Sequence, residues 1–317
     1  MKKLLIAADV DRNLAQLARA DGRFDVEVSP VRTEEELAAI VGDAHILVTR
    51  AYNKVSRRVL ESATNLEVIA QGTSGTDNID DDAVRQRKVS VISLPGENAN
   101  AVAELVIGYM LSLTRTIPFY TREVAAGKWP RDDCATRHEM HHYRLGIAGL
   151  GQVGRRVARL AGAFGMQVAA FDPYLSDGQI TERGAARAGS LQFLLSSSDI
   201  VTLHVPLTPE TRRMIGAREL EIMRAGSLLI NAARGEIIDQ AAALKALASN
   251  HLAGLAMDVT DPEPPAETFP DDPRLIVTPH VAGCTYECRH AIGQKLWEKI
   301  VEFYSTSSRP GSSLRSE

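Results

Sequence analysis

Three side chains that could carry acid–base and anion-binding chemistry lie near the ends of three successive apolar runs. They are Arg234, Glu263 and His280. Short apolar runs bounded by polar turns are typical of buried strands. In an open parallel sheet the carboxyl ends of the strands meet at one edge, where ligands bind. We therefore expect these side chains to gather at one site. The runs are Ser227–Ile230, Leu252–Met257 and Leu275–Val277.

The three side chains suit the oxidation of a hydroxyl group or the reverse reduction. Histidine titrates near working pH, so His280 could take or give the proton of a substrate oxygen. Glu263, whose backbone is stiffened by Pro262 and Pro264, could stabilise the protonated imidazole. The guanidinium of Arg234 could hold a substrate carboxylate through two hydrogen bonds. Taken singly, each residue is more often a solvated surface group, so the prediction depends on a cofactor site beside them.

A glycine-rich turn predicts that cofactor site. Gly149, Gly151 and Gly154 follow the apolar run Leu145–Ala148 and open a helix-forming stretch. Glycines at this spacing allow a tight turn, a backbone close to a pyrophosphate and a helix packed against its strand. Amide groups at the start of the helix favour bound phosphate. Asp172 ends the next apolar run, where a carboxylate binds ribose hydroxyls and repels a 2′-phosphate, so NAD is favoured over NADP.

A second pattern, His138-Glu139-Met140-His141-His142, matches the H-E-x-x-H motif of zinc proteases. That motif needs an α-helix that places both histidines on one face. Here the next residues already enter the strand that leads to the glycine turn. A helix that contained the whole motif would leave no residues to connect it to that strand, so we expect no metal site.

The elements that must position these residues alternate between short apolar strands and amphipathic helices. This alternation predicts parallel sheets covered on both faces, hence an α/β fold. A capping box of Thr33 and Glu36 opens one helix, a long helix spans roughly Ala99–Arg115, and a last one roughly Tyr286–Tyr304. The other expected strands are Leu4–Ala7, Val26–Val28, Ile46–Val48, Val68–Ala70, Val89–Ile92, Leu145–Ala148, Val168–Phe171 and Ile200–His204.

The order of the elements predicts a domain that is discontinuous in sequence. The first third is too short to hold a large core alone, and the last helix can complete it. We expect residues 1–98 and 285–317 to form a smaller, flavodoxin-like α/β substrate-binding domain. Residues 99–284 would form a Rossmann-type, doubly wound NAD-binding domain. Active sites often lie between two such domains.

Composition excludes several classes of function. The chain has 317 residues, 44% hydrophobic and 24% charged, which is typical of a globular protein. Its net charge of −4 gives no basic footprint for nucleic acid. The first apolar run stops at Asp9 and is too short for a membrane span or a secretory signal. The odd set Cys134, Cys284 and Cys288 indicates no disulfide framework, so we expect a cytoplasmic protein.

The ordered motifs resemble those of the D-isomer-specific 2-hydroxyacid dehydrogenases, especially the short forms similar to D-3-phosphoglycerate dehydrogenase. The similarity runs from about Ile46 to Arg289. The motifs that carry it are Gly75-Thr-Asp-Asn-Ile-Asp80, Pro95-Gly-Glu-Asn-Ala-Asn100, Ala103-Glu104, Gly127-Lys-Trp129, the glycine turn, His204-Val-Pro-Leu-Thr-Pro-Glu-Thr211, Asn231 to Gly235, Asp258 to Pro264 and Thr278-Pro-His280.

The resemblance implies a role for each of these segments. It makes Arg234 a substrate-binding group that polarises the carbonyl, His280 the acid/base and Glu263 its hydrogen-bonded partner. It also implies that a loop of Gly72, Thr73, Ser74 and Gly75 offers amides to the substrate carboxylate, and that a homodimer forms around the long helix. The implied cofactor contacts are Gly149, Gly151, Gln152, Val153, Gly154, Asp172, His204, Val205, Pro206, Thr211, Ala232, Gly283 and, at the nicotinamide end, Asp258.

The implied activity is NAD-dependent hydride transfer between nicotinamide and a small D-2-hydroxy or 2-oxo acid, with 3-phosphoglycerate the first candidate. Arg50 and Lys54 resemble the basic loop that phosphoglycerate dehydrogenases place near the substrate phosphate, although two solvated surface cations explain them equally well. Gln71 stands where those enzymes tend to carry Arg, and Thr73 where they carry glycine. A hydroxypyruvate or glyoxylate reductase, or an NAD(H)-sensing protein without turnover, therefore stays an alternative. The sequence does not fix the physiological direction or any protein partner.

Overall fold

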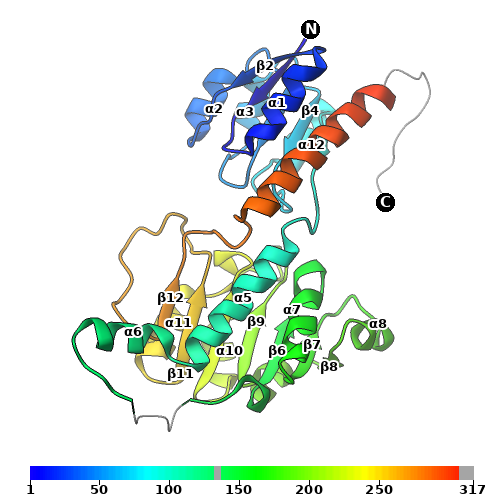
Figure 1. Ribbon diagram of the computed structural model, residues 1–317. Helices are drawn as coiled ribbons and strands as arrows, with labels where there is room; N and C mark the ends of the chain where they lie inside the picture. The colour runs from blue at the N-terminus through cyan, green and yellow to red at the C-terminus, as the bar shows by residue number, and fades with distance from the viewer. Residues whose placement is uncertain (132–136, 307–317) are drawn as a thin grey trace. The chain divides into compact units, whose positions relative to one another are not determined.

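The computed structural model describes residues 1–131 and 137–306, with nothing stated for the side chain of Thr306. Cys134 lies outside these ranges. The chain divides into two compact units (Figure 1). One unit joins Met1–Asn98 to Cys284–Glu317, and the other is Ala99–Gly283. The first is called the discontinuous unit below, and the second the central unit.

The discontinuous unit is built on a parallel sheet. Within its described residues the strand order is β2-β1-β3-β4-β5, the order of flavodoxin-like folds. Helix α1 packs against α12, and α2 against α3. The strands are β1 (Lys2–Ile6), β2 (Phe24–Val28), β3 (Ile46–Thr49), β4 (Val68–Gln71) and β5 (Ser90–Ile92), and the helices are α1 (Arg12–Asp21), α2 (Glu34–Ile40), α3 (Arg57–Ser62), α4 (Asp81–Arg87) and α12 (Tyr286–Thr306).

The central unit contains a second, larger parallel sheet. Among the residues described there, the order is β12-β11-β10-β9-β6-β7-β8, so the chain starts in the middle at β6 and winds outward in both directions. Its strands are β6 (Arg144–Ala148), β7 (Gln167–Phe171), β8 (Ala186–Arg187), β9 (Ile200–Leu203), β10 (Ser227–Asn231), β11 (Leu252–Met257) and β12 (Leu275–Val277). Its helices are α5 (Ala99–Thr114), α6 (Ile117–Ala125), α7 (Gln152–Ala163), α8 (Asp177–Glu182), α9 (Leu191–Ser197), α10 (Ala217–Ile222) and α11 (Gln240–Ala248), with short 3-10 turns η1 (Met140–His142) and η2 (Gly235–Ile237).

The predicted fold class is confirmed, because both sheets are parallel and flanked by helices. Each predicted strand is present, with ends that differ by no more than two residues, and the capping box of Thr33 and Glu36 opens α2. The two-residue strand β8 escaped prediction because it is too short to show a periodic pattern.

Helix α5 forms part of the core of the central unit. Most of its residues are buried, and it packs against α7, β10 and β11 (Figure 1). Over the described ranges, no single helix is long and apolar enough to cross a bilayer. Helices α5 and α6 meet that length and composition test only together, as a pair bent by 61°.

The His138–His142 motif does not form an α-helix. Its last three residues make the 3-10 turn η1, which ends at Tyr143, directly before β6. His141 lies beside Glu139, with Nδ1 and Oε2 at 3.4 Å. The helical face that the zinc-protease motif requires is therefore not formed.

Candidate cofactor and catalytic site

Two of the three glycines of the predicted cofactor turn sit where a side chain would collide with backbone. Gly149 has φ 86°, and a Cβ there would lie 2.7 Å from the carbonyl oxygen of His204. A Cβ on Gly154 would lie 2.2 Å from the carbonyl oxygen of Gly149. Around Gly151, by contrast, no described atom beyond its neighbours would lie within 4 Å of a Cβ. The turn thus packs tightly on the protein side and stays open at its middle glycine.

Helix α7 starts directly after that open glycine. Gly151 is its N-cap and, having no side chain, gives no capping hydrogen bond. Backbone amides at such a helix start bind phosphate groups. The turn and the helix therefore fit a dinucleotide pyrophosphate, with Gln152 and Val153 as the first two residues of the helix.

Asp172 lies beside the same turn, at the carboxyl end of β7. Its Oδ2 accepts a hydrogen bond from the amide of Leu150 at 2.9 Å, and its Oδ1 accepts one from the amide of Tyr174 at 3.1 Å. These bonds fix the carboxylate next to the glycine turn, the place where the nucleotide ribose is expected.

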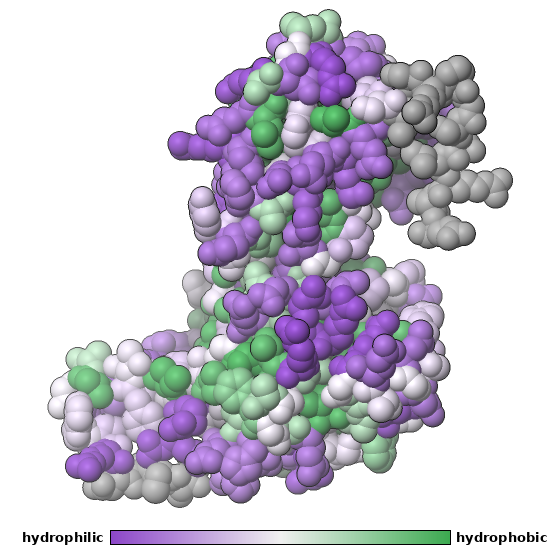
Figure 2. Space-filling model, turned by 45° about the vertical axis from the view of Figure 1, so that its right-hand side comes forward, coloured by the Kyte–Doolittle hydropathy of each residue, from purple (hydrophilic) through white to green (hydrophobic). Residues whose placement is uncertain are grey.

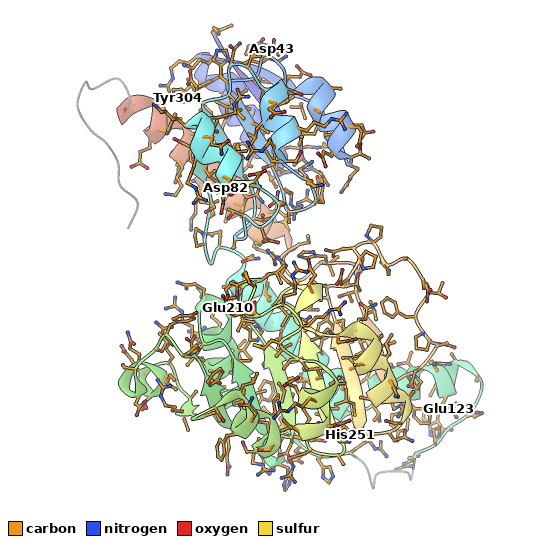
Figure 3. The ribbon with its side chains drawn as sticks, turned by 180° about the vertical axis from the view of Figure 1, so that it is seen from behind. Asp43, Asp82, Glu123, Glu210, His251 and Tyr304 are labelled. Carbon is orange, nitrogen blue, oxygen red and sulfur yellow. The ribbon has the colours of Figure 1, made fainter. Side chains whose placement is uncertain are left out.

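The segment from His204 to Thr211 follows β9 and lies on the other side of the turn. Gly149 is in close approach to both His204 and Val205, and the hydroxyl of Thr211 donates to the carbonyl of Pro206 at 2.6 Å. Burial lowers the pKa of His204 to about 3, so its ring is neutral, and it bonds Thr202 Oγ1 at 3.0 Å. Glu210 in this segment and His251, just before β11, mark the carboxyl and amino edges of the central sheet (Figure 3).

His280 and Glu263 form a hydrogen-bonded pair. His280 Nδ1 lies 2.9 Å from Glu263 Oε1 and 3.1 Å from Oε2. Both side chains are partly exposed, at 35% and 43%. A carboxylate can only accept, so Nδ1 carries the proton, and in the neutral ring the lone pair lies on Nε2.

The backbone of His280 is held in an unusual conformation. Its φ of 53° lies in the left-handed region, which is costly for a histidine. The carbonyl of Asp258 accepts its amide at 2.7 Å. Because surrounding bonds must maintain such a conformation, the direction of the imidazole is set by this loop.

Asp258 provides most of those bonds. It is 1% exposed, and its carboxylate accepts the amides of Val281 and Ala282, each at 2.9 Å, and the hydroxyl of Thr278 at 2.5 Å. Tyr109 of α5 hydrogen-bonds the same hydroxyl, and burial raises the pKa of Tyr109 to about 12. Sequence reasoning gave Asp258 only a cofactor contact and missed its role in the His280 loop. The cofactor contact stays a prediction.

Arg234 lies in a loop that a buried amide organises. The side chain of Asn231, at the end of β10, donates to the carbonyl of Arg234 at 2.8 Å and accepts the amide of Ala233 at 3.1 Å. A Cβ on Gly235 would lie 2.0 Å from the carbonyl oxygen of Thr260. The loop of Arg234 therefore packs directly on the segment that follows Asp258 and leads to Glu263.

The central unit thus brings the predicted cofactor and catalytic residues to one edge of its sheet. Ala232 directly follows β10, and Gly283 closes the unit. The signal that could have revealed Asn231 and Thr278 is their position: each is a polar residue at the end of an apolar strand.

The remaining predicted substrate residues belong to the discontinuous unit. Arg50 donates to the carbonyl of Asp9 at 3.2 Å and to Cys284 Sγ at 3.4 Å. Arg289, which sequence reasoning did not single out, donates to the same carbonyl at 3.0 Å and pairs with the carboxylate of Asp9. Lys54 pairs with Glu34 at 2.8 Å. Of the two predicted cations, Arg50 therefore shares the Asp9 carbonyl with a second guanidinium, whereas Lys54 is paired with a carboxylate.

Comparison with known proteins assigns the family. Residues 107–282 match the NAD binding domain of the D-isomer specific 2-hydroxyacid dehydrogenases. The D-3-phosphoglycerate dehydrogenase of Methanocaldococcus jannaschii is 35% identical over 305 residues, 95% of this chain and 57% of that one. The Escherichia coli (strain K12) enzyme of the same name is 34% identical over 313 residues, 96% and 75% of the two chains. The chain thus spans little more than half the length of some curated relatives.

Solved structures agree with this assignment. The TT0316 protein of Thermus thermophilus superposes with a TM-score of 0.85 at 29% identity, covering 96% of this chain and 97% of that one. A glyoxylate reductase of Paecilomyes thermophila gives 0.85 at 26% identity, covering 95% and 94%. The glycine turn fits a dinucleotide and the matched domain binds NAD, so NAD is the cofactor. The chain belongs to the D-isomer specific 2-hydroxyacid dehydrogenase family.

Proposed function

We propose that this protein is an NAD-dependent dehydrogenase that interconverts a small D-2-hydroxy acid and its 2-oxo acid. One observation carries the proposal: the His280–Glu263 pair, with 2.9 Å between Nδ1 and Oε1, lies at the sheet edge that also holds the glycine turn. An imidazole oriented by a carboxylate is suited to exchange a proton with a substrate oxygen.

Each of the three residues has a separate task. NAD, when bound, supplies the nicotinamide carbon that takes up or releases the hydride. In oxidation His280 accepts the hydroxyl proton at Nε2, and Glu263 stabilises the imidazolium that forms. In reduction His280 returns that proton to the carbonyl oxygen. Arg234 binds the substrate carboxylate and draws electron density from the adjacent carbonyl.

The first candidate substrate is 3-phosphoglycerate. Two observations support a distal anion: the relatives named above bear that activity in their names, and Arg50 and Arg289 both donate to the carbonyl of Asp9. A hydroxypyruvate or glyoxylate reductase is the second candidate. The ion pair of Lys54 with Glu34 favours it, because that pair neutralises one of the two cations expected at a phosphate.

The test is turnover of NADH or NAD with a panel of acids. 3-Phosphoglycerate, glycerate, hydroxypyruvate, glyoxylate and D-lactate cover both candidates. His280→Ala should lower kcat by about 10²- to 10⁴-fold, the usual contribution of a general acid or base, and leave NADH binding unchanged. His141→Ala, at an exposed histidine of the same unit, is the control.

Three outcomes distinguish the candidate functions. Near-normal turnover in His280→Ala contradicts the assigned role. NADH binding without turnover of any acid favours an NAD(H)-sensing protein instead. If the phosphorylated acid gives the highest kcat/KM, and Arg50→Ala with Lys54→Ala removes that lead, phosphoglycerate is the substrate.

A homodimer in the cytoplasm completes the proposal. Figure 2 shows hydrophobic residues at the surface of the central unit among hydrophilic ones. In and after α6, the large exposed apolar side chains include Ile117, Val124 and Trp129. A second copy of the chain would cover them.

A further inference from the structure

We propose that Gln71 is a positioning residue that fixes two loops of the discontinuous unit at once: Gly72–Gly75 and Arg50–Asn53. This inference rests on the proposed function, because both loops are expected to bind the substrate. Gln71 is the last residue of β4 and is fully buried.

The amide of Gln71 meets partners from three segments. Its Oε1 accepts the hydroxyl of Thr49, at the end of β3, at 2.6 Å. Its Nε2 lies 2.9 Å from Thr73 Oγ1, 3.0 Å from the Gly75 carbonyl and 2.8 Å from Asn78 Oδ1. A carbonyl can only accept, so the nitrogen must face Gly75, and this sets the orientation of the amide. The buried side chain of Gln71 thereby connects the start of the Gly72–Gly75 loop to its end.

Asn78 extends the network to the second loop. Its Nδ2 donates to the carbonyls of Arg50 at 3.1 Å and Asn53 at 2.7 Å, and the amide of Arg50 donates to Asn53 Oδ1 at 2.9 Å. The two loops also begin side by side, since the amide of Gly72 donates to the carbonyl of Thr49 at 2.7 Å. The backbone around Arg50 and the shape of the Gly72–Gly75 loop therefore both depend on the side-chain amide of Gln71, directly or through Asn78.

The site is suited to a neutral residue. The four partners of Gln71 are two hydroxyls, a carbonyl and a side-chain amide, none of them an anion. A buried guanidinium without a counter-ion is unfavourable. Gln71 thus directs its polar atoms into the loop, and the contacts to substrate are left to the loop itself and to Arg50.

Steady-state kinetics of two variants test the proposal. Gln71→Met keeps the side-chain length and removes all four contacts. Thr49→Val keeps the volume and removes only the hydroxyl that orients the amide. We expect KM for the 2-oxo acid to rise about 10-fold or more in Gln71→Met and less in Thr49→Val, as for loss of buried hydrogen bonds. The affinity for NADH should not change, because the cofactor residues belong to the central unit. Gln86→Met, at an exposed glutamine that bonds Arg57, is the control.

The double variant separates positioning from general destabilisation. Because Thr49 acts through Gln71, Thr49→Val should change nothing further in a Gln71→Met background. Additive effects, or an unchanged KM in a folded Gln71→Met protein, would overturn the proposal.

A readout without turnover keeps the proposal testable if the proposed activity fails. Amide hydrogen exchange of Val55, Gly72 and Ile79, whose amides donate to the carbonyls of Asn78, Thr49 and Thr76, should be slow in the wild type. It should be faster in Gln71→Met, or in Thr49→Val if Gln71→Met does not fold. Equal exchange in variant and wild type contradicts the proposal whatever the substrate is.

Discussion

At the scale of single residues, the proposed reaction depends on how Glu263 holds His280. Replacing Glu263 by Gln keeps the shape of the side chain but removes its charge, so the imidazolium formed during oxidation loses its counter-ion. A hydrogen bond to a charged group contributes about 1.5–3 kcal/mol, hence kcat should fall about 10- to 100-fold. Glu267→Gln, at an exposed carboxylate of the same loop, should have no effect. The measurement is kcat across pH with NADH affinity as a second readout, and a normal kcat in Glu263→Gln at every pH would refute the role.

Some residue roles could be predicted from the sequence and others could not. Arg234, Glu263 and His280 could be proposed because each side chain has an evident use in hydride transfer. The roles of Asp258, Asn231 and Gln71 could not, because each depends on which backbone groups return to it from distant segments. Asp258 illustrates the difference: its type and position suggested a ligand contact, whereas its carboxylate is bound by the loop of His280.

At the scale of elements, the close packing of β6, the glycine turn and α7 makes a sharp prediction. Gly154→Ala would place a methyl group 2.2 Å from a backbone oxygen of Gly149, so the helix must move away from the turn. Overpacking of this kind costs about 1–3 kcal/mol, and we expect the Kd for NADH to rise about 10-fold or more. Gly162→Ala lies in the same helix and meets no described atom within 4 Å. It should bind NADH normally and, by removing a helical glycine, raise the free energy of unfolding by about 0.5–1 kcal/mol. Isothermal calorimetry measures the Kd for NADH, and thermal unfolding measures the change in stability. Equal NADH affinity in the two variants would contradict the packing argument.

Elements were the most predictable level of this fold. Runs such as Leu252–Met257 are apolar throughout because parallel strands are buried on both faces, and β11 has the predicted bounds. The order of the strands in space could not be read from such runs, since every buried strand looks alike. The glycine turn predicted a doubly wound sheet, but the place of β6 within it is known only from the strand pairing of the structure.

At the scale of the whole molecule, the exposed apolar side chains of α6 predict self-association. In this helix no residue is buried, and Ile117 and Val124 are 49% and 48% exposed. Such exposure in a helix next to a mostly buried one is typical of a surface that a partner covers. We expect a dimer at micromolar concentration, in line with the proposed homodimer. Charges introduced there would be buried unpaired on association, which strongly disfavours it.

The variant Ile117→Asp with Val124→Asp should therefore sediment as a monomer. Phe193→Asp, which adds one carboxylate at a 57% exposed aromatic residue of α9, should leave the dimer intact. Sedimentation velocity distinguishes the species directly. Because the glycine turn and the His280 pair are held by bonds within one chain, the monomeric variant should still bind NADH. A wild type that is monomeric, or a double variant that stays dimeric, would show that α6 is exposed for another reason.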